Sequence, residues 1–281
     1  MRRTLSTERP RRRRAGADSG FTLLELVVTM VLIGILGAVV AMFGNPIRAG
    51  IDGQRRAELA DAADTAYRRM ARDLRRALPN SIRVVGTTLE LIPTKNGGRY
   101  VDVADGGGNY LSFTDAGKLT FDFGGADPDA SVAIANNDFM VISNWGIDPA
   151  NAYCAGDTCN NRTKISVSGN TITMAANPYP ALGADYASPG SRFQVVAGAE
   201  RAVTYDCTGG SLTRRWNYGF NGEAGGSQAL LAKNIQCSFN YVQFNDVNLW
   251  GLIHLQFSMV SSDLPGETVT LVYQLHANNT P

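Results

Sequence analysis

Residues 18–43 have the sequence DSGFTLLELVVTMVLIGILGAVVAMF, and they decide what kind of chain this is. From Phe21 to Phe43 the run is apolar and almost unbroken, and Glu25 is its one acid. As a helix, 23 residues would be about 35 Å long, which is enough to cross a bilayer. A carboxylate next to hydrocarbon is costly unless something pairs with it, so Glu25 is a candidate functional residue.

Charge is distributed unevenly around this apolar run. Residues 1–20 contain seven arginines, Glu8 and Asp18, which leaves 19 basic and 23 acidic residues in the remainder of the 281-residue chain. Basic arms can bind nucleic-acid phosphates, but arginines beside a membrane helix hold their end on the cytoplasmic side. We therefore expect a cytoplasmic leader, a head beyond Phe43 on the opposite side of the membrane, and no nucleic-acid partner.

The order of the leader and the apolar run is informative. A secretory signal peptide has a shorter apolar core, followed by a cleavage site of small residues. Here the small residues of DSG, at 18–20, come before the apolar run. A cut at this position would remove the arginines and keep the membrane anchor.

A helical pattern continues beyond the apolar run. Gly44 and Pro46 are expected to interrupt or kink the helix. The pattern then resumes with apolar residues at three- and four-residue steps, and Pro79 ends it, so the helical element should cover Phe21 to Leu78. The apolar positions of this second half are Ile47, Ile51, Leu59, Ala63, Ala66, Met70, Leu74 and Leu78.

From Ser81 onward the composition becomes typical of β-strands. Short segments rich in β-branched and aromatic residues alternate with Gly, Asn and Asp. Apolar and polar residues alternate in segments 251–260 and 267–275, and the predicted inner residues are Ile253, Leu255, Phe257, Met259, Val269, Leu271, Tyr273 and Leu275. Three hairpins are expected, with turns at Asn96-Gly97, Gly169-Asn170 and Gly209-Gly210.

The predicted fold class is α+β, with one long helix packed on an antiparallel sheet. We expect four segments: a basic leader at 1–20, a membrane helix at 21–43, an amphipathic continuation at 44–80 and a β-rich head at 81–281.

Four cysteines, Cys154, Cys159, Cys207 and Cys237, all lie in the part expected outside the cytoplasm. An even number of cysteines in an oxidising compartment predicts two disulfides. Three pairings are open. We favour Cys154–Cys159, which closes a small loop, and Cys207–Cys237, which would join two strands. Zinc is the alternative, but its sites need tight paired spacings such as C-x2-C, and only the C-x4-C of Cys154 and Cys159 comes close.

The segment SGFTLLELVV, at 19–28, resembles the prepilin signal of type IV pilins and of the pseudopilins of type II secretion. The family pattern is a basic leader, a Gly before the cut, an aromatic residue or Met after it, Glu at the fifth mature position and about twenty apolar residues. Gly20, Phe21 and Glu25 occupy these positions. The resemblance implies cleavage between Gly20 and Phe21 by a membrane-embedded aspartyl prepilin peptidase, and methylation of the new amino group of Phe21.

The resemblance also implies where the chain resides and what it meets. It would cross the bacterial inner membrane once with its head in the periplasm, and then enter a pilus or pseudopilus. Its partners would be prepilin peptidase, other minor and major subunits, the inner-membrane assembly platform and membrane lipid. Glu25 would meet the positive amino terminus of a neighbouring subunit, so that each charge offsets the desolvation of the other.

The head is larger than that of most major pilins, which favours a minor subunit. Its sequence is similar to the large minor pilins grouped with PilW and pseudopilin J. The segments LPNSIRV, LELIPTKNGGRYV and RFQVVAGAERAVTYDCTGGSLTRRWNYGF resemble most the MshO family of MSHA pilus biogenesis proteins. Members of this class are thought to prime or cap the fibre. The alternatives are a J-type minor pseudopilin of type II secretion and a binding module at a fibre tip.

Little in the sequence favours catalysis. The chain has two histidines and no G-x-S-x-G nucleophile motif. His254 falls on the predicted polar face of its strand, so we expect no enzyme. The stretches GGADPDA (124–130) and NNDF (136–139) have oxygen ligands for calcium but not the ordered spacing of a calcium loop, so we expect surface turns and no cofactor. Trp145, Trp216 and Trp250 are candidates for partner contacts or for the core.

Overall fold

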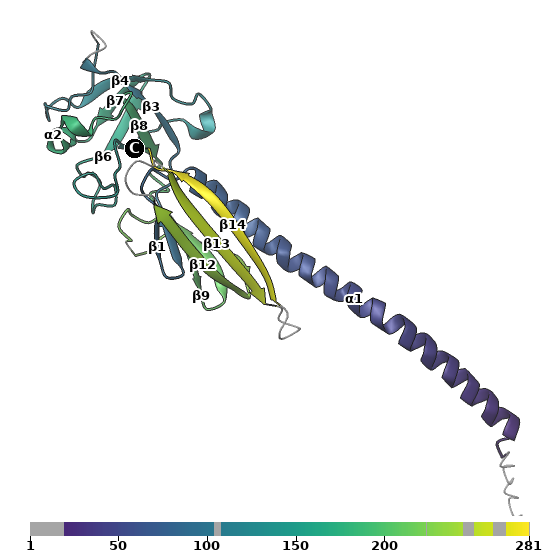
Figure 1. Ribbon diagram of the computed structural model, residues 1–281. Coiled ribbons are helices and arrows are strands. Elements are labelled where there is room, and N and C mark those ends of the chain that lie inside the picture. Colours follow the sequence, from purple (N-terminus) through teal and green to yellow (C-terminus); the bar gives the residue numbers. More distant parts are fainter. Residues whose placement is uncertain (1–19, 104–107, 223, 244–249, 261–267, 281) are drawn as a thin grey trace, which may run out of the picture. The chain divides into compact units, whose positions relative to one another are not determined.

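The computed structural model describes residues 20–103, 108–222, 224–243, 250–260 and 268–280 (Figure 1). Except for Gly20, the basic leader lies outside the described residues. The chain forms two compact units, one ending at Gln54 and the other beginning at Arg55.

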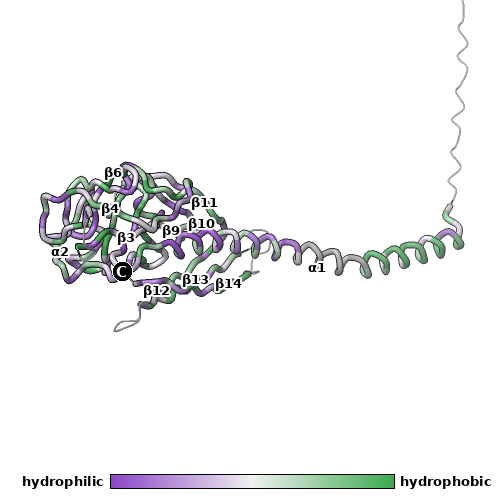
Figure 2. The backbone as a smooth tube through the Cα atoms, turned by 90° about the horizontal axis from the view of Figure 1, so that it is seen from above, coloured by the Kyte–Doolittle hydropathy of each residue, from purple (hydrophilic) through white to green (hydrophobic). Residues whose placement is uncertain are grey.

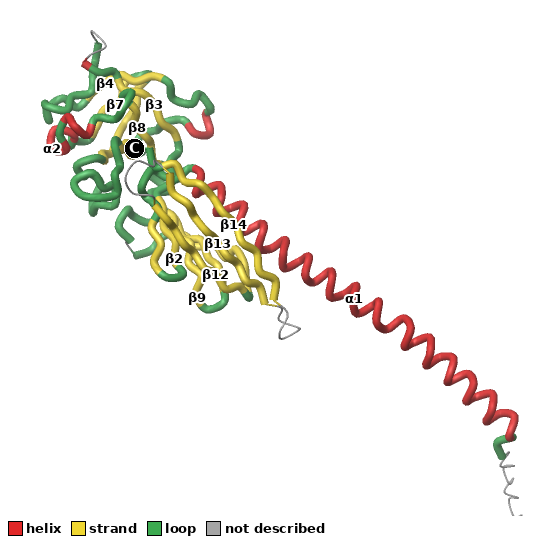
Figure 3. Tube along the Cα trace, in the orientation of Figure 1, coloured by secondary structure: helices red, strands yellow, loops and turns green. Residues whose placement is uncertain are grey.

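One long helix, α1, covers Leu23–Arg75. It continues through Gly44 and Pro46 without a break (Figure 3), so the predicted interruption at these residues is wrong. A proline removes only one backbone donor, and its fixed φ is compatible with a helix, so the bonds on either side keep the element continuous.

The helix ends three residues before the expected Leu78. The backbone N–H of Leu78 donates to the Ile92 carbonyl at 2.7 Å, and the N–H of Thr94 donates to the Arg76 carbonyl at 2.6 Å. Residues 76–78 therefore pair with 92–94 around an isolated antiparallel bridge between Ala77 and Pro93, and this tertiary pairing ends the helix before Pro79 does.

The head contains two open antiparallel sheets. The five-stranded sheet has the order β1 (Arg83–Val85), β2 (Thr88–Leu91), β9 (Val203–Thr208), β10 (Ser211–Trp216) and β11 (Ser227–Lys233). The three-stranded sheet has the order β12 (Ile235–Gln243), β13 (Trp250–Val260) and β14 (Thr268–Asn278).

The head also contains a closed barrel, which the sequence did not predict. Its order is β3 (Asn96–Tyr100), β4 (Thr120–Gly124), β7 (Thr171–Met174), β6 (Arg162–Ser168), β5 (Phe139–Val141) and β8 (Arg192–Val196). Short helices α2 (Tyr179–Leu182), η2 (Ala130–Val132) and η3 (Ala184–Tyr186) lie in its connections. The barrel strands and the open sheets occupy different ends of the head (Figures 1 and 3).

The predicted apolar stripe of the helix is confirmed over its last turns. Ala63, Ala66, Met70 and Leu74 are almost fully buried, and they share one core with Leu89, Val203, Tyr205 and Leu212 of the first sheet and Ile253, Leu255 and Phe257 of the second. Both open sheets and the end of α1 therefore fold around a single apolar layer.

The alternation of β13 and β14 is also confirmed. Ile253, Leu255, Phe257 and Met259 are buried and His254, Gln256 and Ser258 are less so, while the inner residues of β14 are half-buried or buried. On β14, the ring of Tyr273 stacks on Tyr67 of α1, with centroids 3.7 Å apart.

Two of the three predicted hairpins are present and one is wrong. Gly169-Asn170 joins β6 to β7 and Gly209-Gly210 joins β9 to β10, with positive φ at all three glycines. Asn96-Gly97, by contrast, lies inside β3 and pairs with β8. Gly97 allows β3 and β8 to approach closely, since a Cβ on Gly97 would stand 2.9 Å from the carbonyl oxygen of Phe193.

Candidate processing and assembly segment

Gly20 and Phe21 lie just before the start of α1. Both are exposed, and 75% of Phe21 is accessible. A Cβ at Gly20 would have no neighbour within 4 Å, and the residue is in no helix or strand. The backbone at the two residues is therefore accessible and outside the helix, as a peptidase substrate needs to be.

Thr22 caps the helix, a role that the sequence analysis missed. The backbone N–H of Glu25 lies 3.3 Å from Thr22 Oγ1 and 3.0 Å from the Thr22 carbonyl oxygen. The signal was available, because Thr followed three residues later by Glu before an apolar run is the capping-box pattern. The cap fixes the first turn of α1 directly after the predicted cleavage site.

Glu25 stands in that first turn, where a negative charge is favoured by the exposed backbone N–H groups of the helix end. Its side chain is exposed. Within the described part of the chain, no side-chain ion pair or hydrogen bond of Glu25 is present. The carboxylate is therefore available to a group outside this chain.

The helix that follows is apolar on every side. Residues Leu23–Met42 form a helical stretch of 20 residues that is long and apolar enough to cross a membrane, and none of it is buried in the protein. Figure 2 shows hydrophobic residues along this part of α1 and hydrophilic residues at its opposite end. None of the described residues covers the side chains of this stretch, so their surface needs lipid or other helices.

Comparison with known proteins agrees with this segment. Residues 17–41 match the family model of the prokaryotic N-terminal methylation motif. No curated protein and no solved structure matches the chain.

The motif indicates a type IV pilin-like or pseudopilin-like protein. It implies processing by prepilin peptidase and assembly with other pilins, and with the apolar helix it fits a membrane-anchored, pilus-associated protein. The motif match ends at residue 41, so it does not extend to the head.

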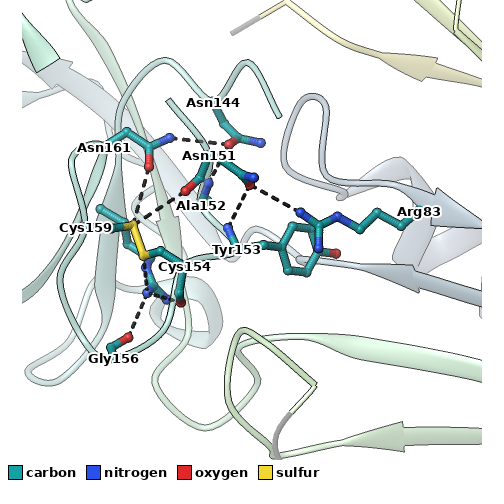
Figure 4. Close-up of a disulfide and its surroundings, with 10 residues drawn as sticks. Arg83, Asn144, Asn151, Ala152, Tyr153, Cys154, Gly156, Cys159 and Asn161 are labelled. Atoms are coloured by element: carbon teal, nitrogen blue, oxygen red, sulfur yellow. Dashed lines mark hydrogen bonds between the residues drawn. A yellow bond between two sulfur atoms is a disulfide. The ribbon is translucent and has the colours of Figure 1, made fainter. Parts of the chain in front are cut away.

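The head contains two disulfides, Cys154–Cys159 and Cys207–Cys237, the pairing that the spacing favoured. The first closes the loop 154–159. In the segment just before it, the side-chain oxygen of Asn144 accepts from the backbone N–H of Ala152, and that of Asn151 accepts from the backbone N–H of Tyr153 (Figure 4). Buried Arg162 donates from Nη2 to the Cys154 and Gly156 carbonyls and lies 3.4 Å above the Phe220 ring. The disulfide therefore belongs to a dense polar cluster.

The stretches considered for calcium use their oxygens locally. Asp127 and Asp129 each accept from a backbone N–H two residues onward, and Asp138 pairs with Lys95 Nζ at 2.8 Å. Across the described residues, no group of three or more His, Cys, Asp or Glu is arranged to hold a metal ion.

The three tryptophans have different environments. Trp216 packs against the core of the open sheets, whereas Trp250, at the start of β13, and Trp145, in the loop after β5, are 56% and 49% exposed. His254 lies on the outer face of β13, with Nδ1 3.4 Å from Gln274 Nε2. The sequence pattern did not separate the exposed tryptophans from the partly buried Trp216.

Proposed function

We propose that the chain is a large minor pilin of an MSHA-like type IV pilus, and that it primes or caps the fibre as a structural subunit and not as an enzyme. Prepilin peptidase cleaves between Gly20 and Phe21, and Phe21 is then N-methylated. The mature subunit stays in the inner membrane through α1 until it joins the fibre, with its head in the periplasm.

The carboxylate of Glu25, which has no side-chain partner among the described residues, is the observation that carries this proposal. It stands in the first turn of α1, in the apolar and uncovered stretch Leu23–Met42 and four residues after Phe21. Cleavage places a new positive amino group on Phe21, and in a stack of parallel helices that group meets Glu25 of an adjoining subunit. The pair acts mainly as a register device, because either charge left alone near lipid is costly.

The first experiment identifies the mature N-terminus. Protein isolated from its host is digested and examined by mass spectrometry, and the expected first residue is N-methylated Phe21. Gly20→Ala should slow processing, visible as a larger band on a gel beside prepilin peptidase. Recovery of an intact leader, or of a different first residue, from the unmodified chain would overturn the proposal.

The second experiment tests the pairing. Glu25→Gln keeps the size of the side chain but removes its charge, so the variant should be cleaved normally yet be lost from co-purified fibre complexes. Glu25→Asp, which retains the charge, should assemble better than Glu25→Gln. Normal assembly of Glu25→Gln would show that charge pairing at this residue is not required.

The alternative is that the chain is a J-type minor pseudopilin of a type II secretion system. Cleavage, methylation and the pairing of Glu25 would be the same in that system. The genes that neighbour this one distinguish the two, since pilus assembly genes and secretion genes differ.

A further inference from the structure

A surface pocket on the barrel end of the head is not used by the proposed assembly role. Its volume is about 330 Å³, and it is lined by Trp145, Ile147, Asp185 and Tyr186. This size falls in the range of small-molecule sites, about 300–1,000 Å³. The lining comes from the loop after β5 and from η3, which precedes β8, and β5 and β8 are neighbouring barrel strands.

The walls of the pocket are held by the backbone. The N–H groups of Trp145 and Gly146 both donate to the Ala150 carbonyl, at 2.9 and 3.2 Å. Gly146 has φ of +72°, and a Cβ there would stand 2.7 Å from the carbonyl oxygen of Asn80. On the other side, the N–H of Tyr186 donates to the Gly183 carbonyl at 3.2 Å. The aromatic side chains therefore project from fixed backbone.

The two rings form a corner. The centroids of Trp145 and Tyr186 are 6.3 Å apart and their planes meet at 82°, so the pair is edge to face and both rings border the same pocket. Trp145 remains 49% exposed and Ile147 68% exposed, although burial of either would stabilise the fold. Such an exposed apolar patch beside a hollow is typical of a binding site.

The charge in the pocket is negative. The Asp185 side chain is exposed, and among the described residues it has no ion pair or side-chain hydrogen bond. Among the residues that the structure describes, no Lys or Arg lines the pocket. Aromatic faces attract cations through their quadrupole, and a carboxylate adds to that attraction. A saccharide would instead favour a flat ring platform with several hydrogen-bonding partners, which two perpendicular rings do not provide.

We propose that this pocket binds an organic ammonium group, with Trp145 and Tyr186 against its methyl or methylene groups and Asp185 against its charge. Two kinds of ligand could supply this ammonium group. One is a lysine side chain, with a primary ammonium, and the other is a choline-type headgroup, with a quaternary ammonium. The inference is independent of cleavage and fibre assembly.

The test uses the full chain, labelled with nitrogen-15, in a polyoxyethylene detergent that contains neither ammonium nor sugar groups. Trp145→Phe assigns the indole N–H resonance of Trp145. Tetramethylammonium and n-butylammonium are titrated, together with neutral 3,3-dimethylbutanol and glucose. The expected result is a saturable shift of the Trp145 resonance with at least one cation, and no saturable shift with the neutral compounds.

Variants identify the contributing groups. Trp145→Ala and Asp185→Asn should each weaken cation binding about fivefold or more. Isothermal titration calorimetry measures the binding of the Trp145→Ala variant, which lacks the indole signal. Trp250→Ala and Asp61→Asn, at exposed positions elsewhere in the head unit, should leave it unchanged. Tighter binding of butylammonium would identify a lysine-like ligand, and tighter binding of tetramethylammonium a choline-like one. Binding of the neutral alcohol as tight as that of the cations, binding of glucose alone, or no binding would overturn the proposal.

Discussion

At the scale of single residues, Asp73 is the charge on which the attachment of the helix to the head depends. Its side chain is fully buried near the end of α1, where Arg214 Nε donates to it at 2.8 Å and the Tyr205 hydroxyl at 2.7 Å. Arg214 also pairs with Glu200. Burial, and then the charge of Asp73, raises the pKa of Tyr205 above its ordinary value. Asp73 also pairs with Arg76 Nη2 at 3.3 Å, so several cations meet this one buried carboxylate.

Asp73→Asn should therefore destabilise the head strongly. It leaves the buried Arg214 with one carboxylate partner, and breaking a buried pair costs about 3–5 kcal/mol in the free energy of unfolding. Asp64→Asn is the matched control, because its 2.6 Å bond to Arg68 lies on the exposed side of the same helix and is worth about 0.5 kcal/mol or less. Urea unfolding followed by tryptophan fluorescence measures both, and equal losses would contradict the assigned role of Asp73.

At the scale of elements, the barrel depends on the close approach of β3 to β8. A Cβ on Gly98 would stand 2.8 Å from Phe193 Cζ and 3.1 Å from the carbonyl oxygen of Gly124. Phe193 is buried in the barrel core and meets the rings of Phe121 and Phe123 edge to face. The glycine therefore provides space for a core aromatic, and no positive φ is required there.

Gly98→Ala should cost about 1–3 kcal/mol of stability, the range for overpacking a well-filled core. Gly124→Ala, on the neighbouring strand β4, is the control, since its Cβ would meet nothing within 4 Å. Thermal unfolding of the two variants under the same conditions measures the difference. An alanine at 98 that is tolerated as well as one at 124 would show that β3 and β8 are not so closely apposed.

At the scale of the whole molecule, the Cys207–Cys237 disulfide joins β9 of one open sheet to β12 of the other. The cysteines are 30 residues apart in the chain, against 5 for Cys154–Cys159. Because the entropy removed from the unfolded chain grows with loop length, the long crosslink should stabilise the fold more.

Replacing Cys207 and Cys237 together by alanine should lower the free energy of unfolding by about 3–4 kcal/mol, and replacing Cys154 and Cys159 by about 2 kcal/mol. Denaturant unfolding of both double variants provides the ranking, and reducing agent should lower the melting temperature of the unmodified protein. The reverse ranking would indicate that the polar cluster around the small loop outweighs chain entropy.

Alkaline pH should also destabilise the head, because burial keeps several tyrosines neutral. Burial raises the pKa of Tyr100 to about 12 and those of Tyr153 and Tyr179 well above 10. These groups ionise near pH 10 in the unfolded chain but later in the fold, so their contribution to stability is complete below pH 10 and is lost as the pH rises through the folded values. The melting temperature should fall above pH 10, with a delayed rise in tyrosinate absorbance. A simple titration near pH 10 without unfolding would contradict this prediction.

Local chemistry made the N-terminal segment and much of the strand pattern predictable. The apolar run, Glu25 and the small residues before Phe21 act through sequence spacing alone, and the alternation along β13 follows from burial of one face. The turns at Gly169 and Gly209 were predictable because positive φ favours glycine locally. By contrast, the pairing of residues 76–78 with 92–94, the six-stranded barrel and the glycines of β3 depend on segments far apart in the chain. So do the burial of Asp73 and the meeting of Trp145 with Tyr186. Such contacts are decided by packing and by the pairing of buried polar groups, and no local pattern of residues specifies them.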